Sequence, residues 1–328
     1  MLWRALQEAR TLDLPDWWVV SGAVYNSVWN AMEGKSTGYG IKDIDLFYFD
    51  PDTSWEAEDR VIRLAEQHFF RSPPVEVRNQ ARVHLWYEDR FGHPTLPLTD
   101  CEESLFRFAS ETHAVAVRLK AEDQIEVRAP FGLDALFEMR MVPNTRVLNR
   151  RTHEAKGARC QSLWPGIKVE PWPELTMIDS EMFCDWARVL ELIRGAFAYM
   201  DGRIDPPSSM HRLTVQSIEQ KAKSELCFLA HDGFEITGCV FCDPREEALY
   251  VGKLAVDPAH QGKGIGKALM ARAEAEARSR GMGVLELETR IELSENHAAF
   301  ARLGFLKTGE STHVGYEKAT SIIMRKSL

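Results

Sequence analysis

The sequence has few cysteines and no long apolar run. Six cysteines spread over 328 residues are too sparse for a disulfide framework. Cys239 and Cys242 have zinc-like spacing, but no second Cys or His pair has matching spacing, so we expect buried free thiols. The first 18 residues contain no apolar core of signal-peptide length, and no run approaches a membrane span. These absences favour a cytoplasmic protein without a membrane partner.

The chain also lacks an excess of positive charge. Its formal net charge is -9, which argues against broad nonspecific nucleic-acid binding and leaves only a local basic patch open. A hydrophobic content of 45% and a charged content of 27% describe a globular protein that can bury real cores. The length of 328 residues predicts two domains of ordinary size.

The most informative stretch of the chain runs from Leu249 to Gly281. Mostly apolar and β-branched residues predict a strand over Leu249–Val256, which ends at the proline that follows Asp257. A glycine-punctuated loop comes next, and apolar residues then recur at helical spacing until Gly281. The predicted order is therefore strand, glycine loop and helix.

Such a junction favours an anionic ligand. The first amides of a helix lack intrahelical partners, and the helix dipole adds partial positive charge at that end. Glycines let a phosphate approach the backbone, and Lys263 and Lys267 add full charges. The sequence therefore predicts a ligand that carries a diphosphate.

The spacing of the glycines distinguishes between known phosphate loops. Neither the Walker pattern GxxxxGK[ST] nor the dinucleotide pattern GxGxxG fits glycines at 262, 264 and 266. The pattern [Q/R]xxGx[G/A] does fit, as Gln261, Gly264 and Gly266. Here the chain resembles the GNAT superfamily of acyl-CoA-dependent N-acyltransferases, in which this motif holds the coenzyme A pyrophosphate. The resemblance implies acetyl-CoA as cofactor, held by Gln261, Gly262, Lys263, Gly264, Ile265, Gly266 and Lys267.

The rest of the second half agrees with this resemblance. The predicted element order from about Pro173 is β-α-α-β-β-β-α-β-α-β-β, with Ser180 as the N-cap of a first helix from Glu181. The segment Asn296–Phe305 ends in Leu-Gly-Phe and resembles the second GNAT motif, whose helix packs beside the acyl-CoA. The resemblance therefore implies a GNAT fold with a central mixed sheet flanked by helices.

The same resemblance implies roles for single residues. The amide of Leu254 or Val256 is expected to hold the thioester carbonyl, with Ala255 less well matched, and Asn296 is expected beside the pantetheine arm. Many members carry a tyrosine acid where this chain has Phe300, which would instead lie beside the acyl-CoA. Tyr316 is a candidate replacement acid, and Glu286 and Glu288, which share one strand face, are candidate bases that act through water.

The first half contains a pair of carboxylates, Asp43 and Asp45, in a strand-like run. Their i, i+2 spacing directs both to one face, where they repel each other unless a cation or proton lies between them. Preceded by Ser21-Gly22, the run resembles the nucleotidyltransferase superfamily related to polymerase β. That resemblance implies Mg²⁺ and a nucleoside triphosphate, with Glu76 on a later strand as third carboxylate. Ala23 departs from the pattern, so a degenerate, binding or regulatory domain stays open beside an active one.

These observations predict an α/β (α+β) protein in three parts. Residues 1–144 form a nucleotidyltransferase-like domain with a mixed sheet, residues 145–172 a basic linker, and residues 173–328 the GNAT domain. The leading hypothesis is an acetyl-CoA-dependent N-acetyltransferase that acts on a small-molecule or RNA-linked amine. The alternatives are a nucleotidyltransferase with an acyl-CoA-sensing domain, and a regulatory protein that catalyses neither reaction. The sequence does not specify the acceptor amine or the oligomeric state.

Overall fold

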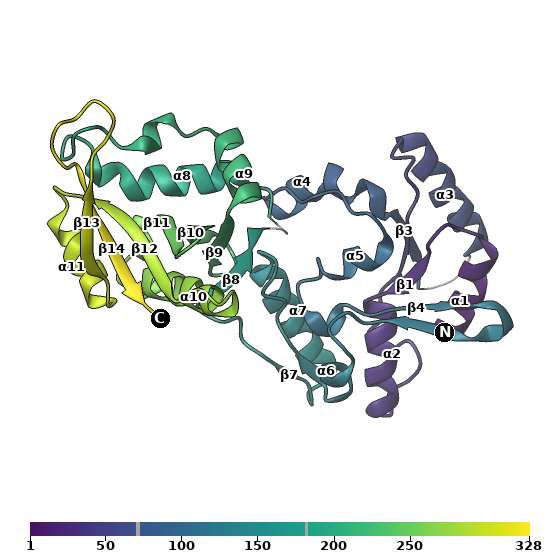
Figure 1. The fold of residues 1–328 in the computed structure, drawn as a ribbon. Helices are drawn as coiled ribbons and strands as arrows, with labels where there is room; N and C mark the ends of the chain where they lie inside the picture. The colour runs from purple at the N-terminus through teal and green to yellow at the C-terminus, as the bar shows by residue number, and fades with distance from the viewer. Residues whose placement is uncertain (70–72, 181–182) are drawn as a thin grey trace. The chain divides into compact units, whose positions relative to one another are not determined.

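The computed structural model describes residues 1–69, 73–180 and 183–328, and the chain divides into two compact units, Met1–Pro173 and Glu174–Leu328 (Figure 1). Both units combine helices with mixed sheets, which confirms the predicted α/β class. No helix among these residues is long and apolar enough to cross a membrane.

A five-stranded sheet in the order β3-β2-β1-β4-β5 organises the first unit. Its strands are β1 (Trp18–Val20), β2 (Ile44–Tyr48), β3 (Val75–Asn79), β4 (Ala116–Leu119) and β5 (Ile125–Arg128). Only β2 and β3 run parallel. The helices are α1 (Leu2–Thr11), α2 (Gly22–Met32), α3 (Trp55–His68), α4 (Tyr87–Phe91), α5 (Cys101–Leu105), α6 (Asp134–Phe137) and α7 (Arg150–Leu163). The short strands β6 (Arg140–Met141) and β7 (Lys168–Val169) pair separately.

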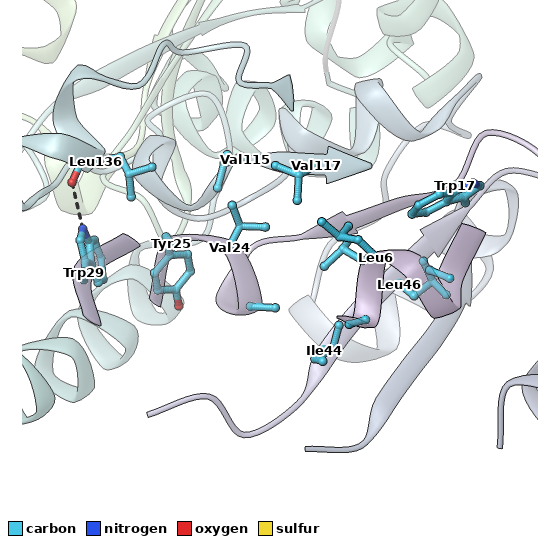
Figure 2. Close-up of a cluster of buried hydrophobic side chains, with 14 of the residues drawn as sticks. Leu6, Trp17, Val24, Tyr25, Trp29, Ile44, Leu46, Val115, Val117 and Leu136 are labelled. Carbon is cyan, nitrogen blue, oxygen red and sulfur yellow. Dashed lines mark hydrogen bonds between the residues drawn. The ribbon is translucent and has the colours of Figure 1, made fainter. Parts of the chain in front are cut away.

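The core of the first unit lies between this sheet and the helices α1 and α2. Figure 2 shows side chains from these helices, including Leu6 and Val24, beside sheet residues such as Val117. Trp29 is fully buried there, and its indole Nε1 donates a hydrogen bond to the Leu136 carbonyl at 2.9 Å. The buried indole is therefore satisfied by the backbone, as a polar group in a core must be.

The segment 145–172 is not a linker, which corrects the predicted domain boundaries. Its helix α7 buries Cys160 in the core of the first unit, and the adjoining Trp164 is buried there as well. Two of the basic residues that suggested a solvated linker make contacts within the first unit. Arg159 donates to the Gly40 carbonyl at 2.7 Å, and Arg150 pairs with Glu154. A few buried side chains hold this helix in the core, among them Cys160 and the adjoining Trp164. A count of residue types does not detect so few positions.

A seven-stranded sheet in the order β13-β14-β12-β11-β10-β9-β8 organises the second unit. Its strands are β8 (Thr176–Asp179), β9 (Leu226–His231), β10 (Ile236–Pro244), β11 (Leu249–Val256), β12 (Val284–Arg290), β13 (Leu306–Ser311) and β14 (Ser321–Ser327). The helices are α8 (Trp186–Phe197), α9 (Val215–Ser224), α10 (Ile265–Ser279) and α11 (Ser294–Arg302). Figure 1 shows α8 and α10 on opposite sides of the sheet. The element order is the one predicted from the sequence.

The start of α8 differs from the prediction. The helix begins at Trp186, and the Asp185 side chain caps it by accepting from the Arg188 amide at 3.2 Å. Ser180 therefore does not cap α8, and the predicted first helical residue, Glu181, lies outside the described residues. Two strand features matter for the site: β11 and β12 are parallel and pair only at Leu249–Leu285 and Tyr250–Glu286, so the strands separate beyond Tyr250.

Candidate functional site

A cavity of about 1150 Å³ lies in the second unit, where β11 and β12 separate. Its wall includes most of the residues that the sequence singled out: Leu254, Val256, Ala255, Gln261, Gly262, Gly264, Ile265, Gly266, Lys267, Glu288, Asn296, Phe300 and Tyr316. Among the described residues, Lys263 and Glu286 are not part of this wall. The structure thus places the residues predicted for the acetyltransferase site, which come from five separate segments, around one cavity.

The glycine loop forms an open cradle at the N-terminus of α10. Gly264 is the N-cap and has a left-handed φ of 82°, and Gly262 has a φ of 80°. No described atom lies within 4 Å of a Cβ added at either position. Only glycine adopts such φ values without strain, and the first amides of the helix have no intrahelical partners. The arrangement is suited to an anionic group that approaches the backbone.

A bulge in β11 shapes the wall next to this cradle. The register between β10 and β11 shifts between Cys239 and Phe241, and Lys253 adopts a φ of 48°, which is strained for a residue with a side chain. Leu254 and Val256 follow directly and line the cavity. β12 pairs with β11 only at Leu249 and Tyr250. The part of β11 after the bulge therefore has no backbone pairing with β12.

The two candidate bases on β12 have different surroundings. Glu286 is buried, and its carboxylate lies 3.2 Å from the Arg245 guanidinium and 2.7 Å from that of Arg325. Glu288 is exposed and lines the cavity, and among the described side chains it accepts a single hydrogen bond, at 3.2 Å, from the Ser311 hydroxyl. Glu286 therefore holds strands together, whereas Glu288 has an oxygen available for a ligand.

The candidate acids are also differentiated by the structure. Phe300, which stands where many GNAT members carry a tyrosine acid, packs against the core with its ring centroid 6.1 Å from that of Phe305, and a phenyl ring has no acidic proton to donate. The Tyr316 hydroxyl donates to the Asp205 carboxylate at 2.6 Å, and this hydrogen bond raises the pKa of Tyr316. The tyrosine proton is therefore already engaged by the Asp205 carboxylate, which is not among the residues that line the cavity.

Sequence reasoning missed several polar residues of the wall, among them Tyr199 and Lys253. The Tyr199 hydroxyl accepts a hydrogen bond from the Asn296 amide nitrogen at 2.8 Å, which fixes Asn296 at the cavity. The Lys253 ammonium donates to the Ser209 hydroxyl at 3.1 Å. A lysine within the apolar run Leu249–Val256 was a usable signal, because a charge in a central strand needs a reason to be there.

In the first unit, Asp43 and Asp45 lie beside the N-terminus of α2. Asp45 is the direct register partner of Val20 on one side and of Glu76 on the other. Ser21, which follows Val20, has a strained φ of 53° and is buried. Burial and the neighbouring Asp43 raise the pKa of Asp45 to about 6. The two acids thus lie close enough for Asp43 to disfavour the charged form of Asp45, and their catalytic role stays a prediction.

The metal-binding role of Asp43, Asp45 and Glu76 stays a prediction. Within residues 1–69, 73–180 and 183–328, no three His, Cys, Asp or Glu side chains are grouped so as to hold a metal ion. Glu76, the register partner of Asp45, is exposed and lies 3.5 Å from the Arg78 guanidinium. Lys156 of α7 also acts on the two aspartates: burial lowers its pKa, and Asp45 and Asp43 oppose that shift. We therefore derive no reaction step that passes through a metal ion.

The raised pKa of Asp45 predicts a pH-dependent stability. The unfolded pKa is about 4, so ionised Asp45 destabilises the folded unit as the pH rises through about 6, and the cost is absent below about 4. We expect Asp45→Asn to raise the free energy of unfolding of the first unit by about 3 kcal/mol near pH 8 and to have no effect near pH 4. Urea unfolding of both proteins at several pH values measures this difference. A difference that does not change with pH contradicts the assignment.

All six cysteines are free thiols, as predicted. Cys239 and Cys242 are fully buried in β10, and burial raises the pKa of both thiols to about 12. Burial in β10 therefore disfavours the thiolate form of both cysteines.

Each unit matches a family model. Residues 7–169 match the model of a nucleotidyltransferase family, and residues 186–305 match that of the acetyltransferase (GNAT) family. Both predicted resemblances are confirmed, and the first match extends through α7. No curated protein matches the chain.

Solved structures resemble each unit separately. A structure described as a CCA-adding enzyme head domain is 26% identical, over 51% of this chain and 88% of its own, with a TM-score of 0.43. A nourseothricin acetyltransferase is 30% identical, over 32% of this chain and 65% of its own, with a TM-score of 0.30. The PaiA N-acetyltransferase from Thermoplasma acidophilum, in complex with coenzyme A, is 15% identical, over 47% of this chain and 99% of its own, with a TM-score of 0.40.

Proposed function

We propose that this chain, which joins a nucleotidyltransferase-type domain to a GNAT acetyltransferase domain, transfers an acetyl group from acetyl-CoA to a primary amine. The observation that carries the proposal is the cradle at Gly262 and Gly264, which opens into the same cavity as the bulged strand β11 and the free carboxylate of Glu288. The N-terminus of α10 suits a diphosphate, and the residues beyond it suit chemistry at the other end of a long ligand.

Some residues of the cavity would bind the cofactor, and others would take part in proton transfer. Acetyl-CoA supplies a thioester when it is bound. The amides at Gly264 and the first turn of α10 would hold its pyrophosphate, and Lys267 would add a positive charge. The amides of Leu254 and Val256, which follow the bulge, would donate to the thioester oxygen. Glu288 would accept the proton of the amine, directly or through a water molecule.

The overall reaction balances in bonds and protons. A nitrogen–carbon bond forms between the amine and the acetyl group, and the carbon–sulfur bond breaks. The amine loses one proton and the leaving sulfur gains one. Glu286 has no part in this scheme, because both of its oxygens already face arginines.

The direct test is thiol release from acetyl-CoA in the presence of a panel of primary amines. We expect at least one amine to give thiol at a rate well above the hydrolysis measured without amine, with acetylated amine confirmed by mass spectrometry. Tight coenzyme A binding with no amine acetylated across a broad panel favours an acyl-CoA-sensing role instead.

Glu288→Gln tests the proposed base. We expect kcat/KM for the best amine to fall by about a hundredfold and the acidic limb of its pH profile to flatten, because a positioned base contributes at least this much. Glu310→Gln is the matched control, since Glu310 lies on β13 and pairs with Lys307 at 2.6 Å. A Glu288→Gln enzyme with an unchanged rate and pH profile rules out Glu288 as the base.

A second function, nucleotide binding by the first unit, is favoured by the strained Ser21 at the N-terminus of α2. Lys156 and Arg159 of α7 supply positive charge near the Asp43 and Asp45 side chains. Isothermal titration with each nucleoside triphosphate, with and without Mg²⁺, tests this role. We expect binding by the wild-type chain that weakens in Lys156→Met, and no binding by the wild type refutes the proposal.

A further inference from the structure

One wall of the cavity in the second unit carries three cations, Arg212, Lys221 and Lys253. Lys253 is on β11, Lys221 on α9, and Arg212 ends the 3₁₀ helix Ser209–Arg212. Both α9 and this 3₁₀ helix contact α8. The cluster therefore belongs to the α8 side of the sheet, whereas the glycine cradle belongs to α10 on the other side (Figure 1).

Lys253 is held in place by its backbone and by one neutral partner. Its φ of 48° is sustained by the bulge in β11, and its ammonium donates to the Ser209 hydroxyl at 3.1 Å. Burial and the nearby Lys221 lower the pKa of Lys253. A strained cation that the surrounding fold keeps half-buried indicates a functional position.

The positive charge of this wall is only partly neutralised. Lys221 pairs with Glu225 on the same side of the sheet. In the described part of the chain, no carboxylate pairs with Arg212 or Lys253. Like charges brought together are unfavourable unless anions lie among them. Glu225, which pairs with Lys221 and also acts on Lys253, supplies one negative charge for three cations, so this wall keeps a net positive charge.

A carboxylate lies elsewhere on the wall of the same cavity. Glu288 on β12 faces the space with a single hydroxyl contact at 3.2 Å. The cavity therefore presents one negative group, suited to an amine, together with a separate cluster of positive groups. Such a pair of subsites matches a molecule that carries both kinds of charge.

We propose that the acceptor amine carries an anionic group, a carboxylate or a phosphate, which binds among Arg212, Lys221 and Lys253. This inference rests on the proposed acetyl transfer and adds the chemical class of the acceptor. Polycationic amines without an anionic group are poor ligands for this wall, because they meet uncompensated positive charge.

Matched pairs of amines test the proposal by isothermal titration calorimetry of the full chain saturated with coenzyme A. The pairs are phosphoethanolamine with ethanolamine, and β-alanine with β-alaninamide. We expect the anionic member of at least one pair to bind about tenfold to a hundredfold more tightly, as a charge-assisted contact does. The pair that shows the difference identifies the group as phosphate or carboxylate.

Substitutions assign the preference to the cluster. Lys253→Met and Arg212→Gln are each expected to reduce the preference by about tenfold and to leave binding of the neutral members unchanged. Lys223→Gln is the control, because Lys223 is on α9 outside the cavity and pairs with Glu219 at 2.6 Å. Thermal unfolding of each variant checks that the fold is intact.

Two results overturn the inference: no preference for either anionic member in the wild-type chain, or a preference that both variants retain. Thiol release measured on the same amines separates this result from the proposed function. Acetylation of neutral and anionic amines at equal rates contradicts the anion subsite alone. Selective binding without any acetylation contradicts the proposed transfer alone.

Discussion

Gly264→Glu is expected to weaken coenzyme A binding by about a thousandfold and to abolish acetyl transfer at ordinary donor concentrations. The substitution places a carboxylate at the N-cap of α10, where the proposed pyrophosphate would lie. The new charge takes the place of the ligand at the helix N-terminus and repels the phosphates. Because no described atom lies within 4 Å of the added Cβ, the variant is expected to fold.

The matched control for this prediction is Gly281→Glu. Gly281 lies just beyond the C-terminal end of the same helix, has a φ of 71°, and also has open space around an added Cβ. Gly281→Glu therefore carries a similar backbone strain of about 1 kcal/mol without touching the cradle. Calorimetric titration of both variants with coenzyme A measures the two affinities and tests this prediction. Equal affinity in Gly264→Glu and the wild type shows that the pyrophosphate binds elsewhere.

Trp164→Ala is expected to lower the free energy of unfolding of the first unit by about 4 kcal/mol. Trp164 is fully buried, meets the Trp29 ring at 5.5 Å, and donates from its indole to the Asn30 side chain at 3.0 Å. A Cβ added to Gly40 would lie 2.7 Å from the Trp164 ring, which shows how tightly the site is packed. The substitution leaves a large cavity and an unsatisfied Asn30 oxygen, and both effects are destabilising.

Hydrogen exchange of the amides in β1 and β2 measures this change for the first unit alone. Trp55→Ala is the control within the same unit, because Trp55 is 61% exposed. We expect its effect to stay below about 1 kcal/mol. If Trp164→Ala leaves exchange in β1 and β2 unchanged, the segment after residue 144 is not part of the folded first unit.

The predictable parts of the molecule are those with strong local patterns. The strand, glycine loop and helix of Leu249–Gly281 were predicted with nearly their observed limits, because periodicity and chain breakers agree along one continuous stretch. Asp43 and Asp45 were recognised for the same reason, since i, i+2 spacing directs side chains to one face of a strand. The position of α7 was not predicted, because its contacts with the core come from residues far apart in the chain.

For individual site residues, too, sequence spacing identified candidates and only the long-range contacts distinguished their roles. Sequence spacing treated Glu286 and Glu288 alike, and only the neighbouring strand β14, whose Arg325 faces Glu286, shows that one of them is already neutralised. Lys253 and Tyr199 were missed because their partners, Ser209 and Asn296, are 44 and 97 residues away along the chain.

The sequence by itself determined the two fold types, the element order of the second half and the glycine loop at the N-terminus of α10, because each depends on residues close together in the chain. Only the tertiary structure decided that residues 145–172 belong to the first unit, that Glu76 pairs with Arg78, and that Glu288 rather than Glu286 lines the cavity. The physical reason is that burial, ion pairing and the separation of β11 from β12 depend on long-range contacts, which local spacing does not encode.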